Sequence, residues 1–339
     1  MSKQNKLLNE SLNELTDMSH HKARGFDNIE PFSIRLIDAL RWRIKRKVLP
    51  PKAGYHAFNQ TWCSSIDISL EGNRVWWIGH STTLIRLKNK WILTDPVFSN
   101  RVSPFQFIGP KRRTQPAITI DQLPMVDVVV ISHNHYDHLD FNSIRQLITR
   151  FPQMTILVPL GLKAKLKKWG AKQIIELDWW QSINTHEITF TATPAKHWSN
   201  RGVFDVNKAL WCGWVMQTDI DNPLLTKTIY FMGDTGYSAS LKKIADRFKQ
   251  IDLALIPIGA YAPRWFMQSQ HIDPQQALQL YDELNCQSAI AIHWGAFELA
   301  DEPLDEPPAL LNSLKEDRVF HLLKIGDSLA INPFNNALK

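Results

Sequence analysis

Three histidines and one aspartate fall within six residues of this chain, at His133, His135, Asp137 and His138. This H-x-H-x-D-H spacing directly follows a mostly apolar run at residues 126–131. Such a loop can offer two ligand pairs, with His133 and His135 facing one metal ion and Asp137 and His138 facing a second. Imidazole and carboxylate ligands without thiolate suit zinc, iron or manganese holding reactive water better than a closed structural zinc site. A histidine-rich surface loop is the alternative, because one short motif is only a hypothesis.

Three more residues of ligand type, His197, Asp234 and His293, each follow an apolar segment that is predicted to be a β-strand. Loops at one edge of a sheet are where rigid folds place reactive side chains. Singly, Asp234 could be a turn former and each histidine an ordinary buried residue at a strand end. Together with the H-x-H-x-D-H loop, they predict a single metal centre.

The predicted ligands form two sets around a shared residue: His133, His135 and His197 in one set, Asp137, His138 and His293 in the other, and Asp234 between them. Asp234 has two carboxylate oxygens and can therefore contact two ions. Ions about 3.5–4 Å apart can share a hydroxide, because coordination lowers the pKa of bound water to about 7. Asp137 and Asp234 are accordingly the predicted catalytic carboxylates.

Other polar residues have weaker support from the sequence. His80 begins a turn and is expected to be a hydrogen-bonded structural histidine near the site rather than a ligand. Asp95 follows a strand and is expected to orient a ligand histidine through its second ring nitrogen. Ser81 and Cys212 lack a paired base, so a serine or cysteine nucleophile is disfavoured. No role is assigned to the remaining histidines: His20, His21, His56, His186 and His321.

The composition is that of a globular protein, with 339 residues of which 44% are hydrophobic. Three scattered cysteines without a C-x-x-C pair disfavour a disulfide framework and fit a reducing, cytoplasmic compartment. We expect no secretory signal and no membrane span. The net charge of +6 could serve nucleic acid, anionic lipid or solubility. Nucleic acid is not an expected partner, because no recognisable binding motif is present.

Alternating apolar and amphipathic segments predict one α/β domain at residues 52–339, with two sheets and outer helices. The predicted metal ligands make this the expected hydrolase domain. Asp140 and Asp273 stand at N-cap positions, and Pro274 at a first helical position. The predicted strands are 75–78, 83–87, 91–94, 126–131, 155–158, 188–192, 210–218, 228–232, 253–258 and 289–292. The predicted helices are 141–150, 161–169, 238–248 and 273–284.

Residues 1–51 are predicted to form a polar N-terminal tail and a basic amphipathic helix within residues 31–49. Six basic side chains occur between positions 35 and 47, among apolar residues at helical spacing: Ile34, Ile37, Leu40, Ile44 and Val48. A basic amphipathic helix can lie in a membrane interface. It can equally pack its apolar stripe on the body of the protein, and periodicity does not separate the two interpretations.

The metal-ligand loop resembles the hallmark of the metallo-β-lactamase superfamily. Further motifs, in order and with similar spacing from about residue 62 to 332, resemble the N-acyl-phosphatidylethanolamine-hydrolysing phospholipase D family. These motifs are 79–82, 93–96, 109–112, 131–140, 176–180, 233–237, 257–261, 263–267, 270–271 and 292–295. The longer motifs are more specific than the metal loop alone.

The resemblance implies a four-layer αββα sandwich, two zinc ions held by the same seven ligands, and a homodimer. It also implies that Tyr136 and His271 contact substrate. The expected reaction is hydrolysis of N-acyl-phosphatidylethanolamine to N-acylethanolamine and phosphatidic acid by a metal-bridging hydroxide, at a peripheral membrane surface. The aromatic segment 264–267 would line an apolar channel, or else form ordinary core. The alternative substrate is a small soluble phosphoester or lactone, which a short, open, polar cleft would favour.

Overall fold

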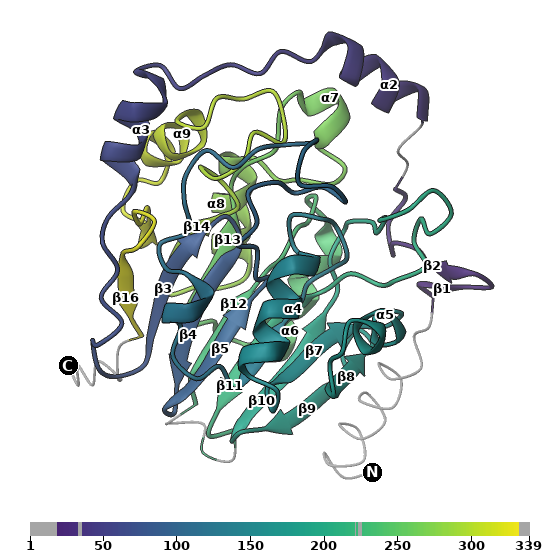
Figure 1. The fold of residues 1–339 in the computed structure, drawn as a ribbon, viewed down its shortest axis with the longest axis vertical. Helices are drawn as coiled ribbons and strands as arrows, with labels where there is room; N and C mark the ends of the chain where they lie inside the picture. The colour runs from purple at the N-terminus through teal and green to yellow at the C-terminus, as the bar shows by residue number, and fades with distance from the viewer. Residues whose placement is uncertain (1–18, 33–35, 221, 223–225, 332–339) are drawn as a thin grey trace.

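Two seven-stranded sheets face each other in the computed structural model, which describes residues 19–32, 36–220, 222 and 226–331 (Figure 1). The first sheet has the order β16 (Ser328–Ala330), β3 (Arg74–Gly79), β4 (Thr82–Leu87), β5 (Lys90–Thr94), β6 (Val128–Val130), β7 (Thr155–Pro159) and β8 (Gln173–Leu177). The second sheet has the order β15 (Phe320–His321), β14 (Ala289–Ile292), β13 (Leu253–Pro257), β12 (Thr228–Phe231), β11 (Gly213–Thr218), β10 (Ile188–Thr193) and β9 (Ser182–Thr185).

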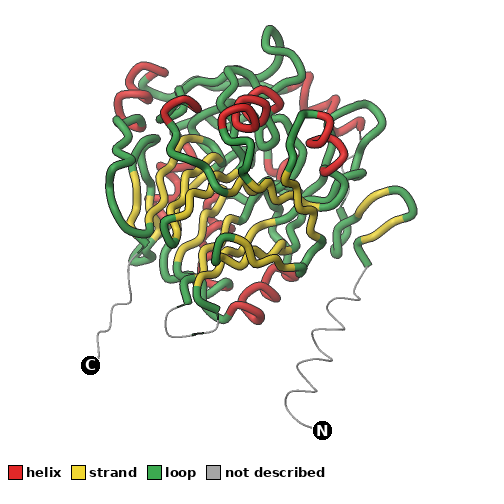
Figure 2. Tube along the Cα trace, turned by 60° about the horizontal axis from the view of Figure 1, so that its bottom comes forward, coloured by secondary structure: helices red, strands yellow, loops and turns green. Residues whose placement is uncertain are grey.

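Both faces of each sheet are covered. Because neighbouring side chains on a strand point to opposite sides, they enter different parts of the core. In β3, Trp77 belongs to the large core that includes residues of both sheets, whereas Trp76 packs in a second core with the outer helices α4 (Phe141–Arg150) and α5 (Lys163–Lys168). Helices α6 (Lys242–Phe248) and α8 (Pro274–Glu283) contribute buried residues to the large core from the second sheet's side. Figure 2 shows the strands gathered between outer helices. The predicted αββα sandwich is confirmed.

Strand direction explains why the predicted ligands share one edge. Strands β5, β6, β7 and β8 are parallel, as are β12, β13, β14 and β15. Strand β10 runs in the same direction as β12, because both are antiparallel to β11. The loops that follow β6, β10, β12 and β14 therefore leave the carboxyl ends of similarly directed strands, where sheet folds of this class place their sites.

Most predicted elements occur close to their expected bounds. Helix α4 spans the predicted residues, and Asp140 caps it by accepting a hydrogen bond from the Ser143 amide. The strand predicted at 210–218 begins later, at Gly213, because the Cys212 amide instead bonds to the carbonyl of Ser132 in the metal loop. Several elements were not predicted: β8, β9, β15, β16, α3 (Gly54–Trp62), α7 (Arg264–Met267) and α9 (Glu306–Leu314).

The basic helix forms as α2 (Leu36–Lys45), with its apolar stripe facing solvent. Ile37 is 68% exposed and Ile44 is 76% exposed. The helix is held on the body through Trp42, which stacks on Phe266 and donates to Asp301 Oδ1 at 2.9 Å. Packing of the stripe on the body, one of the two interpretations of the sequence, is therefore wrong for these residues. Position 34 lies outside the described residues.

Within the described ranges, the helices are all too short or too polar to span a bilayer. A two-stranded hairpin, β1 (His21–Lys22) with β2 (Gly25–Phe26), precedes α2. Of the predicted tail, residues 1–18 lie outside the described part of the chain.

Candidate metal centre

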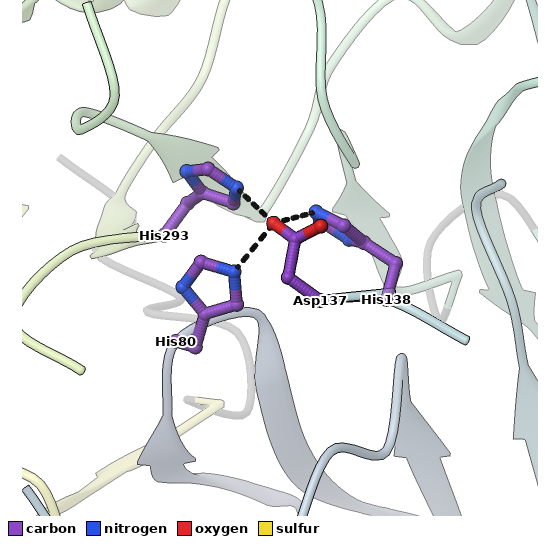
Figure 3. A group of neighbouring side chains, drawn as sticks. All are labelled: His80, Asp137, His138 and His293. Atoms are coloured by element: carbon purple, nitrogen blue, oxygen red, sulfur yellow. Dashed lines mark hydrogen bonds and ion pairs between the residues drawn. The ribbon is translucent and has the colours of Figure 1, made fainter. Parts of the chain in front are cut away.

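The loop after β6 brings Asp137 against three imidazoles from three different segments (Figure 3). Its Oδ2 lies 3.1 Å from His80 Nε2, 3.3 Å from His138 Nε2 and 3.4 Å from His293 Nε2. The His80 and His293 side chains come from the turn between β3 and β4 and from the end of β14. The three histidine side chains are at most 2% exposed. This group is the carboxylate-containing half of the site.

A second, nitrogen-rich group lies beside it. His135 Nδ1 is 2.8 Å from His133 Nε2 and 3.2 Å from His197 Nε2. His133 and His135 come from the loop after β6, and His197 from the loop after β10. The three donor nitrogens lie within 4.8 Å of one another, so that one cation could contact all three.

Asp234 lies between the two groups. Its Oδ2 is 3.0 Å from His138 Nε2, 3.1 Å from His293 Nε2 and 4.0 Å from His197 Nε2. The structure therefore brings together all seven predicted ligands, from four strand ends. It also gives Asp234 the shared position that the sequence assigned to it.

Buried hydrogen bonds orient the donor rings. Asp95 Oδ2 is 2.6 Å from His138 Nδ1, which is the orienting position expected for Asp95. Asp95 also accepts bonds from the amide and hydroxyl of Ser132, whose Oγ lies 2.9 Å from His133 Nδ1. His197 Nδ1 lies 3.0 Å from the Gln270 carbonyl oxygen. These contacts turn the opposite ring nitrogen, Nε2, of each histidine towards the centre.

His80 belongs to the site more closely than the sequence indicated. It was expected to be a hydrogen-bonded residue near the site, and it shares Asp137 Oδ2 with His138 and His293. The signal that identified the other histidines also applied to it, since His80 directly follows the apolar strand β3. Its position in a turn, with φ of 56°, obscured this similarity.

The two residues expected to contact substrate lie in different surroundings. His271 is at the centre, with Nδ1 3.7 Å from Asp234 Oδ2 and its ring 5.4 Å from that of His293. The Tyr136 hydroxyl donates to the carbonyl of Arg201 at 2.8 Å, and the Arg201 guanidinium lies over the Tyr136 ring. A substrate oxygen would have to replace that carbonyl as the partner of Tyr136.

The donor set suits divalent cations. Buried His138 Nε2, His293 Nε2 and Asp234 Oδ1 have no hydrogen-bond partner among the described residues. Buried polar atoms without partners are rare and unfavourable, and cations at the centre would satisfy these three. Burial lowers the pKa of His135 to about 4 and that of His197 to about 3, so their lone pairs are free at neutral pH.

The electrostatics of the carboxylate-containing half also favour a cation. Burial opposes protonation of His293, but the carboxylates of Asp234 and Asp137 outweigh burial and raise its pKa to about 9. The same carboxylates raise the pKa of His138 above its ordinary value, against the opposing effect of burial. The site thus attracts positive charge, which either protons or metal ions can supply.

Comparisons with known proteins agree with this geometry. A family model described as a beta-lactamase superfamily domain matches residues 90–294. "N-acyl-phosphatidylethanolamine-hydrolyzing phospholipase D 1" of Caenorhabditis elegans is 37% identical over 268 residues, covering 74% of this chain and 74% of the relative. The mitochondrial protein of that type from Saccharomyces cerevisiae is also 37% identical, over 71% of this chain and 51% of its own length.

Solved structures show the same fold. A possible metal-dependent hydrolase from Veillonella parvula superposes with a TM-score of 0.62 at 17% identity, over 77% of this chain and all of that one. That structure supports the fold alone. The matched domain and the two sequence relatives, together with the buried donor groups, identify the protein as a metal-dependent hydrolase. The chain belongs to the N-acyl-phosphatidylethanolamine-hydrolysing phospholipase D family of the metallo-β-lactamase superfamily.

Proposed function

We propose that the protein hydrolyses N-acyl-phosphatidylethanolamine to N-acylethanolamine and phosphatidic acid. The observation that carries this proposal is the pair of donor groups joined by Asp234, in a chain 37% identical to a relative named for that reaction. The coarser activity, metal-dependent hydrolysis, follows from the family. The lipid substrate is the added step.

Two cations, proposed to be zinc, would share Asp234: one held with His133, His135 and His197, the other with Asp137, His138 and His293. Iron or manganese would suit the same donors. When bound, such a pair polarises a phosphoryl oxygen and makes water nucleophilic at neutral pH. The Asp137 side chain is 15% exposed and that of Asp234 is 2% exposed. Asp137 is therefore the more accessible of the two carboxylates, and it would orient the incoming water.

His271 is suited to hold the phosphodiester. Burial lowers the pKa of His271 to about 3, so that the neutral imidazole has one N–H to donate to a phosphoryl oxygen. Its backbone carbonyl accepts a bond from Arg264 Nη1 at 2.9 Å, which fixes the segment to α7. Tyr136, from the metal loop, is the second proposed substrate contact, through its hydroxyl.

The exposed surface formed by α2 and by Trp265 of α7 has the residues that a membrane-docking surface needs. The exposed residues Ile37, Leu40 and Ile44 form the apolar stripe of α2, beside basic side chains of the same helix. Trp265 on α7 is 49% exposed and lies under the Arg41 guanidinium. Of the aromatic segment expected to line a channel, Phe266 instead stacks on Trp42, so it joins α7 to α2. We propose that α2 and Trp265 dock on anionic membranes beside the site.

Replacing Ile37 and Ile44 together by glutamate should weaken binding to anionic vesicles. Burying one isoleucine side chain in an apolar phase contributes about 1.5–3 kcal/mol, so the combined loss should be at least about 10²-fold. Vesicle sedimentation measures the effect. Met125→Glu is the matched control. Met125 is 70% exposed and precedes β6, so it lies at the amino end of that strand, whereas the metal loop follows its carboxyl end. Equal binding by the double variant and the control would contradict docking through α2.

The substrate is tested with vesicles that contain N-acyl-phosphatidylethanolamine, in water enriched in heavy oxygen. We expect N-acylethanolamine and phosphatidic acid, with the heavy oxygen in the phosphatidic acid, since water attacks phosphorus. The acyl and glyceride chains supply binding energy that accelerates the reaction at phosphorus, so kcat/KM should exceed that for a small soluble phosphodiester. Mass spectrometry of the products provides the measurement. Faster turnover of a soluble phosphodiester or lactone would favour the alternative substrate class.

A further inference from the structure

We propose that Asn28 is a positioning residue for the metal ligand His197, and that residues 19–30, the N-terminal strap, form part of the metal centre. The side-chain amide of Asn28 makes hydrogen bonds with both the backbone N–H and the backbone C=O of His197. Its Nδ2 donates to the His197 carbonyl oxygen at 2.8 Å, and its Oδ1 accepts from the His197 amide at 3.0 Å. One side chain thus fixes both polar groups of the ligand residue's backbone. The inference rests on the proposed metal site, and not on the lipid substrate.

His197 needs such support because of where it lies. It follows the end of β10, in a loop without helix or strand. Its ring is held at Nδ1 by the Gln270 carbonyl oxygen, and Nε2 points at the donor group, 3.2 Å from His135 Nδ1. Rotation of the peptide would move Nε2 off that position. Misplacement of a site atom by about 1 Å can reduce a rate about 10²-fold.

The end of the strap that follows Asn28 is tied to the same loop. Glu30 Oε2 lies 3.3 Å from Lys196 Nζ, next to His197 in the chain. Glu30 Oε1 accepts the Ser238 hydroxyl at 2.6 Å, in the segment that follows Asp234. The carboxylate therefore bridges the two loops that carry His197 and the shared ligand Asp234.

The other end of the strap is bound to the loop that follows β8 of the first sheet. His20 Nε2 and His21 Nε2 each lie 2.7 Å from one oxygen of Asp178, in the loop after β8. The His20 ring stacks on Trp179 with centroids 4.2 Å apart. The Phe26 amide donates to the Asn207 carbonyl at 2.8 Å. With both ends fixed, Asn28 is presented to His197 in one position.

This arrangement assigns part of the site to residues outside the family-model match at 90–294 and before the predicted domain boundary at residue 51. The part of the predicted tail that the structure describes lies against the hydrolase domain and contacts a ligand-bearing loop. A chain trimmed at that boundary would keep all seven ligands but lose the support of one of them.

The test measures metal affinity in the full chain. Asn28→Ala and Asn28→Asp are titrated with zinc against a chromophoric chelator, and the absorption spectrum of the cobalt-loaded protein reports ligand geometry. Loss of partners that orient metal ligands typically costs about 10–100-fold in affinity, and we expect that range for Asn28→Ala, with an altered cobalt spectrum. Asn28→Asp keeps the acceptor for the His197 amide and loses the donor, so its affinity should be intermediate.

Asn184→Ala is the matched control, because the Asn184 side chain bonds Thr189 Oγ1 on the exposed edge of the second sheet. It should bind zinc as the wild type does. Wild-type affinity and an unaltered cobalt spectrum in Asn28→Ala would overturn the proposal. If Asn28→Ala fails to fold, Asn28→Asp decides, and wild-type affinity there overturns the donor's role. None of these results depends on lipid turnover, so a wrong substrate assignment would leave them unchanged.

Discussion

Removing the cations by chelation should lower the hydrolysis rate at least about 10³-fold, because metal stabilisation of the transition state contributes several kcal/mol. The described residues offer no evident substitute nucleophile at the centre. Ser81 is fully buried, and burial raises the pKa of the Cys212 thiol far above its usual value. The rate is measured on N-acyl-phosphatidylethanolamine vesicles after dialysis against chelator, with metal content determined on the same samples.

Restoration distinguishes metal loss from unfolding. Zinc, iron and manganese are added back separately, and the cation that restores the rate at equimolar loading identifies the working metal. Cations that bind only the folded chain also stabilise it, by about 2.7 kcal/mol at a concentration 100 times Kd. The melting temperature should therefore fall on chelation and recover on loading. Undiminished turnover by protein shown to be metal-free would contradict the metal mechanism.

The ligand set could be predicted from sequence because strand direction does the positioning. His133, His197, Asp234 and His293 are far apart in the chain, but each follows an apolar strand. In a layered fold those strand ends share one edge. The motif-rich segments were also the ones with strong local signals: a buried strand, then a turn, then polar side chains. The elements that escaped prediction, such as β9, carry mixed polar and apolar residues.

The features that the sequence did not predict depend on tertiary contacts that leave no local signal in the sequence. The Asn28 and His197 pair is separated by 169 positions, and nothing near either residue indicates the other. The orientation of α2 shows the same limit. Periodicity located an apolar stripe but not the side that packs, and packing was decided by Trp42 on Phe266, from a distant segment. Sequence patterns report which faces exist, and tertiary contacts decide which of them is covered.

Asp234→Asn should lower both zinc affinity and hydrolysis at least about 10²-fold, since weaker changes to residues that merely orient ligands already cost 10–100-fold. The substitution removes a negative charge that lies 3.0 Å from His138 Nε2 and 3.1 Å from His293 Nε2. It also replaces one carboxylate oxygen by an amide nitrogen, which donates hydrogen bonds and cannot bind a cation. Chelator competition and turnover on lipid vesicles measure the two effects.

Asp252→Asn is the matched control, because Asp252 also neighbours a strand of the second sheet but at its opposite end. Its oxygens accept from the Thr228 amide at 2.8 Å and contact Lys227 Nζ at 3.1 Å. This control should unfold at a somewhat lower temperature and bind zinc normally. Equal losses of zinc affinity in the two variants would contradict a specific role of Asp234, because loss of any carboxylate at a strand end would then have the same effect. A loss confined to Asp234→Asn, and larger than that of Asn28→Ala, would support the proposal that this carboxylate holds the cations.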